Sequence, residues 1–167
     1  MSTLEKDFSA PTSDDAEALS RDRIPVRSMV EADLPAIIEV DRKITGRDRS
    51  AYYRRKLNEM MNEAGVRVSL VAEVDGQFAG FVMARVDYGE YGRTMPTAVM
   101  DTIGVSPLFH HRGVGNALLS QLMLNLSSLK VEKVHTRVAW DDIPMLSFLG
   151  NAGFTPSQRL SFTRPLG

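Results

Sequence analysis

The residues around 101–126 combine a strand ending, polar side chains and glycines in a pattern that could bind a phosphate group. A helix that begins at two closely spaced glycines offers unpaired backbone N–H groups and the positive end of its dipole. The glycines also let an anion approach the backbone without meeting a Cβ atom. The polar residues and glycines of this junction are His110, His111, Arg112, Gly113 and Gly115. The sequence therefore predicts an anion site at this junction.

Two common phosphate motifs do not fit the junction. The dinucleotide fingerprint needs a third glycine where Leu118 stands, and the P-loop needs a Gly-Lys pair followed by Ser or Thr. The pattern instead resembles the acetyl-CoA pyrophosphate loop of the GCN5-related N-acetyltransferase (GNAT) family. The residues that fit the family pattern are Val105, Pro107, Arg112, Gly113 and Gly115, whereas His110 stands where the family usually has Gln or Arg.

The elements that must position this loop follow from hydrophobic periodicity and turn residues. Asp75-Gly76 between two alternating runs predicts a β-hairpin. The apolar run 114–129 predicts a helix largely buried against a sheet. We expect strands at 24–30, 66–74, 78–86, 97–105, 132–140 and 158–164, and helices from 31, from about 48–50, over 114–129, and from 141–142 to about 152.

This element order matches the GNAT family over about residues 24–164. The resemblance implies a mixed α/β fold, with a mostly antiparallel sheet of six to seven strands that splays between its fourth and fifth strands and about four flanking helices. Residues 1–23 are polar and broken by Pro11, so we expect a flexible extension before a single domain at 24–167.

The resemblance also assigns roles to individual positions. The backbone of Ile103 and Val105 would hydrogen-bond the pantetheine arm of acetyl-CoA, and the Ile103 N–H would polarise the thioester carbonyl. Asp142 stands where many members carry an asparagine at the cofactor. Backbone amides from His111 to Asn116, with Val114 among them, would hold the pyrophosphate.

Asp101 is the candidate catalytic side chain. Strict alternation in strand 97–105 would place its carboxylate on the same face as Val99, Ile103 and Val105, which are all apolar. A carboxylate in such a place is either partnered or available as a general base for an amine acceptor. Its position resembles that of a carboxylate with this role in polyamine-acetylating members. The alternative is that Asp101 only satisfies backbone groups beside the splay.

The leaving group is where the sequence departs from the family. Many members have a tyrosine four residues before the Gly-Phe pair at 153–154, and here that residue is Leu149. Leu149 cannot protonate the CoA thiolate, so Ser147, a loop tyrosine such as Tyr88 or Tyr91, or solvent takes over, or the step goes unassisted. A thiol with a pKa near ~8.5 can leave as the thiolate.

Composition excludes several other chemistries. The 167 residues carry a formal net charge of −1, which does not favour nucleic acid or a membrane surface, and they contain no cysteine. The three histidines are not spaced as metal ligands, and no Gly-x-Ser-x-Gly elbow is present. Without a signal peptide or a spanning apolar run, a cytoplasmic protein is the default expectation.

The sequence thus predicts an acetyl-CoA-dependent N-acyltransferase that acts on a primary amine through a ternary complex. The alternative is a catalytically silent acyl-CoA-binding module, which Leu149 and His110 keep open. The basic segment Arg42–Arg55 is either a solvated helix face or a lip of the acceptor site. The identity of the acceptor is left open, and a homodimer is the default for a soluble enzyme.

Overall fold

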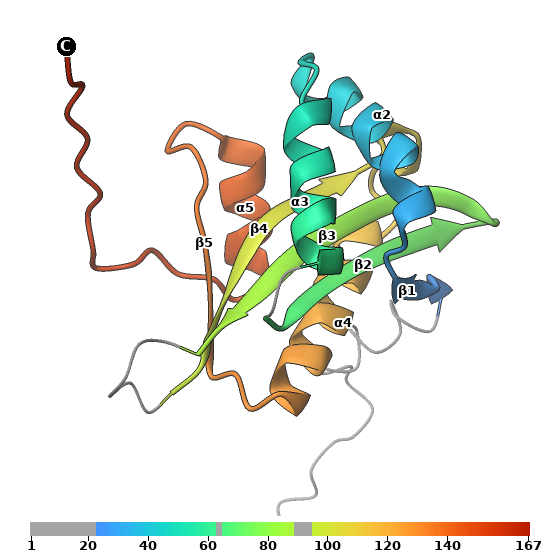
Figure 1. The fold of residues 1–167 in the computed structure, drawn as a ribbon. Coiled ribbons are helices and arrows are strands. Elements are labelled where there is room, and N and C mark those ends of the chain that lie inside the picture. Colours follow the sequence, from blue (N-terminus) through green and yellow to red (C-terminus); the bar gives the residue numbers. More distant parts are fainter. Residues whose placement is uncertain (1–22, 63–64, 89–94) are drawn as a thin grey trace, which may run out of the picture. The chain divides into compact units, whose positions relative to one another are not determined.

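The computed structural model describes residues 23–62, 65–88 and 95–167 of the chain (Figure 1). The chain divides into two compact units, Met1–Thr136 and Arg137–Gly167, and each is described by itself. The predicted extension at 1–23 lies almost wholly outside the described residues, and the predicted domain boundaries stay a prediction. No helix in the described ranges is long and apolar enough to cross a membrane.

A five-stranded sheet with the order β1-β2-β3-β4-β5 forms the centre of the first unit. Neighbouring strands are antiparallel except for β4 and β5, which are parallel. The predicted hairpin at Asp75-Gly76 is confirmed, because both residues take positive φ angles between β2 and β3. The strands are β1 (Val26–Ser28), β2 (Arg67–Val74), β3 (Gln77–Asp87), β4 (Thr97–Val105) and β5 (Lys133–Thr136).

Helices α2 (Leu34–Thr45) and α3 (Ser50–Asn62) cover one face of this sheet (Figure 1). A 3-10 turn, Glu31–Asp33, precedes α2, whose N-terminus tolerates Pro35 because a first-turn residue needs no N–H partner. Tyr53 of α3 packs edge-on against Phe81 of β3 with ring centroids 5.7 Å apart. The buried residues of this layer are Met29, Ile37, Val40, Tyr53, Leu57, Val71, Phe81 and Met83.

Helix α4 (Val114–Ser128) covers the opposite face and matches the predicted helix to within one residue. Its start lies very close to β3. A Cβ atom added at Gly80 would lie 3.0 Å from Val114 Cγ1 and 3.2 Å from Leu118 Cδ1. The absence of a side chain at Gly80 therefore lets the first turn of α4 pack directly on the strand.

A β-bulge in β4 changes which residues share a face. Met83 pairs with Thr102 but Ala84 pairs with Met100, so Asp101 is the extra residue. Beyond the bulge, Ile103 pairs with Val82. Because paired residues point to the same side, the bulge turns Ile103 and Val105 toward the α4 face and keeps Asp101 on the α3 face. The predicted common face of Asp101, Ile103 and Val105 is therefore wrong.

The second edge of β4 is only half paired. Its pairing with β5 begins where Thr97 lies opposite Lys133 and ends where Met100 lies opposite Thr136, just before the bulge. Within the described ranges, Asp101–Val105 has no strand partner on this edge, in agreement with the expected splay between the fourth and fifth strands. Strand β5 is consequently shorter than the predicted 132–140.

The second unit contains helix α5 (Ile143–Asn151) and a C-terminal segment without regular secondary structure. The expected end of the helix is confirmed, with Gly153 at φ 90° just after it. The predicted strand at 158–164 is wrong. The segment has no strand partner in the described residues, and Leu160 and Phe162 are exposed. An alternating sequence forms a strand only where a neighbouring strand edge is available to pair with it. The mixed α/β class is confirmed, but with five strands in the described residues instead of six to seven.

Candidate active site

The open edge of β4 presents backbone groups of alternate residues. Ser106 N donates to Ala79 O at 2.7 Å, so the amide of Ser106 points toward β3. Since successive amides of a strand point to opposite edges, the N–H groups of Val105 and Ile103 point away from β3. These are the two backbone positions expected to bind the pantetheine. In the described residues, no strand pairs with β4 on this edge at Ile103 or Val105.

The predicted phosphate loop lies directly after β4. Buried Ser106 directly follows the strand, and its carbonyl accepts from Phe109 N at 3.0 Å across a single 3-10 turn that begins at Pro107. The chain then bends twice, because His111 and Gly113 adopt φ angles of 59° and 83°. These bends bring the chain to the first residue of α4.

The amides at the start of α4 are available to an anion. The first bond of the helix runs from Ala117 N to Gly113 O, so the N–H groups of Val114, Gly115 and Asn116 have no partner within the helix. The N-cap residue Gly113 has no side chain that could occupy them. These three residues and the positive end of the helix dipole fit the expected pyrophosphate contacts.

The side chains beside the loop are exposed and basic or aromatic. His110 and His111 stack with ring centroids 4.9 Å apart, and the guanidinium of Arg112 lies 6.0 Å from the centre of the Phe109 ring. All three polar side chains are exposed to solvent. These three side chains are not part of the buried core, so each of them is free to contact an anion bound at the loop.

Asp101 lies on the α3 face between two cations. Its Oδ1 is 3.4 Å from Arg85 Nε on β3, and its Oδ2 is 3.7 Å from Lys56 Nζ on α3. The carboxylate is 13% exposed. The two ion pairs fix the position of the carboxylate between β3 and α3.

Tyr52 lies next to this group of charges. Its ring centre is 5.9 Å from Lys56 Nζ and 5.8 Å from the guanidinium carbon of Arg55. Burial raises the pKa of the Tyr52 hydroxyl, and the negative charge of Asp101 raises it further. The phenol is therefore neutral at physiological pH and keeps its proton.

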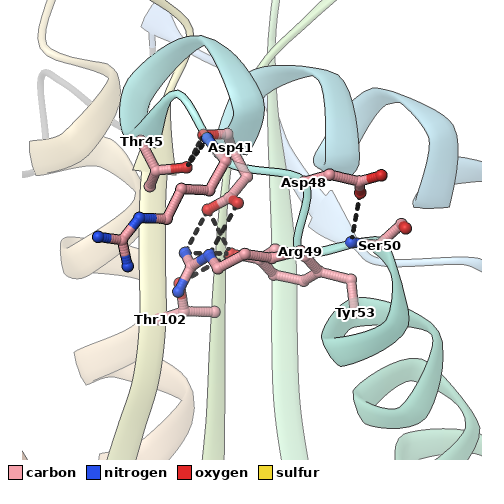
Figure 2. Close-up of polar contacts among 8 residues, drawn as sticks. Asp41, Thr45, Asp48, Arg49, Ser50, Tyr53 and Thr102 are labelled. Atoms are coloured by element: carbon pink, nitrogen blue, oxygen red, sulfur yellow. Dashed lines mark hydrogen bonds and ion pairs between the residues drawn. The ribbon is translucent and has the colours of Figure 1, made fainter.

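A second, buried charge network, which was not predicted from the sequence, joins α2, α3 and β4 (Figure 2). Arg49 binds both carboxylate oxygens of Asp41, with Nε 2.9 Å from Oδ2. The Tyr53 hydroxyl donates to Asp41 Oδ1 at 2.8 Å and lies 3.4 Å from Thr102 Oγ1. Thr45 Oγ1 donates to the backbone carbonyl of Asp41 at 2.8 Å.

Burial and hydrogen bonding oppose each other at Asp41. Burial acts to raise the pKa of its carboxyl, but hydrogen bonds from Arg49 and Tyr53 outweigh it and bring that pKa below the ordinary value. For Tyr53, burial is the main cause that raises the pKa of the hydroxyl. The network is thus an ionised carboxylate bound by a cation and a neutral phenol. Such an arrangement suits a structural role, and we call the contacts of Asp41 with Arg49 and Tyr53 the structural tie.

A further ion pair, also missed from the sequence, fixes the start of α2. Arg27 of β1 binds the buried carboxylate of Asp33 through two nitrogens at 2.7 and 2.8 Å, and its Nε donates to Glu73 at 2.9 Å. The hydrogen bond from Arg27 lowers the pKa of Asp33.

The remaining predicted site residues belong to the second unit. Asp142 is the N-cap of α5, where its Oδ1 accepts from Met145 N at 3.2 Å. Leu149 lies in the last turn, and its carbonyl accepts from Phe154 N at 3.0 Å. A cofactor contact of Asp142 therefore stays a prediction. No group of three or more metal-ligating side chains occurs in the described residues.

Comparison with known proteins agrees with this geometry. The sequence profile of the Acetyltransferase (GNAT) family matches residues 34–154. The chain therefore belongs to the GNAT family and is an N-acetyltransferase, which confirms the expectation drawn from the loop after β4.

Solved structures show the same fold at low sequence identity. Aminoglycoside N-acetyltransferase AAC(6′)-Iy, in complex with a CoA-containing bisubstrate analogue, is 18% identical with a TM-score of 0.71 over 86% of this chain and 99% of that one. AAC(6′)-IG from Acinetobacter haemolyticus is 19% identical with a TM-score of 0.70, over 85% and 99%. A transcriptional regulator from Bacillus halodurans is 14% identical with a TM-score of 0.72, over 84% and 99%.

Proposed function

We propose that this protein transfers the acetyl group of acetyl-CoA to a primary amine by direct attack within a ternary complex. The observation that carries the proposal is the outer edge of β4, which no strand of the described residues pairs with from Asp101 to Val105, and which leads straight into the open amides of α4. One continuous stretch of backbone can therefore bind an extended arm and the phosphates that follow it. Structural neighbours in complex with CoA or with a CoA analogue support this donor.

The strand edge supplies the binding of the arm and the stabilisation of charge. The outward N–H and C=O groups of Ile103 and Val105 hydrogen-bond an amide-containing chain as a neighbouring strand would. Acetyl-CoA, when bound, supplies the reactive thioester. As the amine attacks, negative charge develops on the carbonyl oxygen, and the fixed N–H of Ile103 stabilises it without reorganisation.

The loop and the first turn of α4 hold the pyrophosphate. The amides from His111 to Asn116 lie in the loop and in the first turn of the helix, at its positive end, and Gly113 and Gly115 have no side chain to obstruct the approach. Arg112 and His110 add side-chain donors at the solvent side. The change from the usual Gln or Arg to His110 leaves the backbone contribution intact.

Proton transfer is assigned to Asp101. Alkyl amines have pKa values near ~10 and arrive protonated, so a proton must leave before attack. The carboxylate of Asp101 accepts it, directly or through water. Leu149 has no proton to give, so the thiolate departs unassisted or takes its proton from solvent or another side chain.

The test is calorimetric titration of the protein with acetyl-CoA and with CoA. We expect dissociation constants on the order of micromolar for the wild type. Gly115→Glu should abolish binding, because it places a side chain and a negative charge in the loop. Gly150→Glu is the matched control, since a Cβ atom at Gly150 meets no atom within 4 Å. If Gly115→Glu binds as tightly as the wild type, the loop does not hold the pyrophosphate.

A further inference from the structure

The charges around Asp101 indicate what kind of amine the site accepts. Among the described residues, the ion pairs that connect to Asp101 join three cations to two carboxylates. The cations are Arg55, Lys56 and Arg85, and the carboxylates are Glu59 and Asp101. Arg67 and Asp87 lie on the same face of the sheet by register and alternation, and they add one charge of each sign. An acceptor that approaches Asp101 therefore meets a group of side chains with one more cation than carboxylates.

The nitrogen–oxygen distances in the ion pairs around Asp101 are longer than those in the two ion pairs that have a structural role. Arg27 closes on Asp33 at 2.7 Å, and Arg49 holds Asp41 through two nitrogens. Charge-assisted hydrogen bonds have such lengths, of about 2.7–2.9 Å. Each of these two arginines makes two hydrogen bonds to one buried carboxylate.

The cations at Asp101 leave capacity for another anion. Arg85 Nε is 3.4 Å from Asp101, and Lys56 Nζ is 3.7 Å from both Asp101 and Glu59. The Arg55 and Glu59 side chains are 3.9 Å apart. The Arg85 side chain is 42% exposed, so its other guanidinium nitrogens can reach a ligand. Two incompletely bound cations thus flank the carboxylate that accepts the proton.

From this geometry we propose that Lys56 and Arg85 bind a carboxylate of the acceptor, so that the substrate is an amino acid or a similar amine with a carboxylate close to the reacting nitrogen. This inference rests on the proposed function, because it places the amine at Asp101. A polycation such as an aminoglycoside or a polyamine finds Asp101 and Glu59 already paired with Lys56, Arg85 and Arg55, and the positive charges of these side chains repel it as well.

The experiment measures CoA release from acetyl-CoA with matched pairs of acceptors. Each pair consists of an amino acid and its carboxamide, which differ in the negative charge, and spermidine and an aminoglycoside are included as polycations. We expect kcat/KM to be roughly tenfold or more higher for the free carboxylate than for the carboxamide, the size of one well-placed charge-assisted contact. The polycations should be the poorest acceptors.

Variants identify the side chains responsible. Arg85→Gln should bring the ratio of kcat/KM between carboxylate and carboxamide close to one, mainly through KM for the carboxylate. Arg54→Gln is the matched control, because it removes an exposed cation from α3 and should leave the ratio unchanged. Lys56→Gln tests the same subsite from the helix and serves if Arg85→Gln does not fold, as judged by circular dichroism.

The outcomes separate the two proposals. Equal rates for carboxylate and carboxamide, or a preference for the polycations, overturn the carboxylate subsite while acetyl transfer stands. A preference that survives in both Arg85→Gln and Lys56→Gln also overturns it. Absence of CoA release with every amine contradicts the proposed function itself.

Discussion

The buried carboxylate of Asp41 allows a stability prediction that can be worked out contact by contact. Asp41→Ala removes the acceptor for two nitrogens of Arg49 and for the Tyr53 hydroxyl. We expect the free energy of unfolding to fall by about 2–4 kcal/mol. Replacing Asp by Ala in a helix returns up to ~0.7 kcal/mol through propensity, which is included in this range.

The magnitude follows from what each partner can do afterwards. Hydrogen bonds to a charged group contribute roughly 1.5–3 kcal/mol each. The Arg49 side chain is 41% exposed and regains water, so its loss is discounted toward the lower value. Tyr53 is 1% exposed, and its hydroxyl keeps only the 3.4 Å contact with Thr102 and the contact with Arg49, so it loses its best partner at a cost of about 1–3 kcal/mol.

The assay is urea unfolding followed by far-UV circular dichroism, since Trp140 is 87% exposed and a poor probe of the core. Glu39→Ala is the control in the same helix, because Glu39 is half exposed and only 3.7 Å from Lys43. It should change the free energy of unfolding by no more than ~0.5 kcal/mol. Equal effects of Asp41→Ala and Glu39→Ala would refute the assignment of Asp41 as a structural tie.

Three further predictions concern the strand edge, the proton acceptor and acid stability. Gly104→Ala should lower the free energy of unfolding by about 1–3 kcal/mol in the same urea assay, because its Cβ would lie 2.7 Å from Phe81 Cε1. Asp101→Asn should lower kcat at neutral pH and recover it at high pH, where the amine deprotonates unaided; a wild-type pH–rate profile would remove Asp101 from the mechanism. The lowered pKa of Asp33 means that its stabilisation is present above its unfolded pKa, near ~3.9, and is lost as pH falls through the folded value. Asp33→Asn should therefore flatten the fall in the urea midpoint below about pH 4, and an unchanged slope would show that Arg27 does not hold an ionised Asp33.

The parts of the fold that could be predicted are those that depend on local signals. The turn at Asp75-Gly76 needs two positive φ angles, and residues of these types supply them. The run 114–128 is apolar enough to require burial, and Gly113 marks its start. The loop after β4 could be predicted for the same reason, because its glycines and helix start are local in sequence.

The bulge at Asp101 could not be predicted, because an extra residue leaves no trace in an alternating pattern. Thr97–Val105 fits a regular strand equally well, and only the pairing with β3 shows that Asp101 and Thr102 both point to the α3 face. The prediction of a last strand was wrong for the opposite reason. Its pattern at 158–164 is regular, but a strand also needs a partner edge, which local sequence does not encode.

The network of Asp41 did leave a signal. Asp41 follows Ile37 by four residues and therefore lies on the apolar face of α2, where Ile37 and Val40 are buried. The argument that singled out Asp101, a carboxylate among apolar residues, applies equally to Asp41. Its partners could not be found in the same way, since Arg49 and Tyr53 lie beyond a helix break whose geometry the sequence leaves open.

The bulge connects the structural tie to the candidate active site. Thr102 contacts Tyr53 of α3, and the preceding residue, Asp101, contacts Lys56 one helical turn further along the same side of that helix. Because Asp41 and Arg49 hold the Tyr53 hydroxyl, the position of Lys56 relative to β4 is set before any acceptor arrives. A site built on two rigid elements keeps its charges in place, so binding an anion there does not first require α3 to be ordered. The two consecutive residues of the bulge thus serve different ends, one fixing the helix and the other presenting the carboxylate that the helix helps to place.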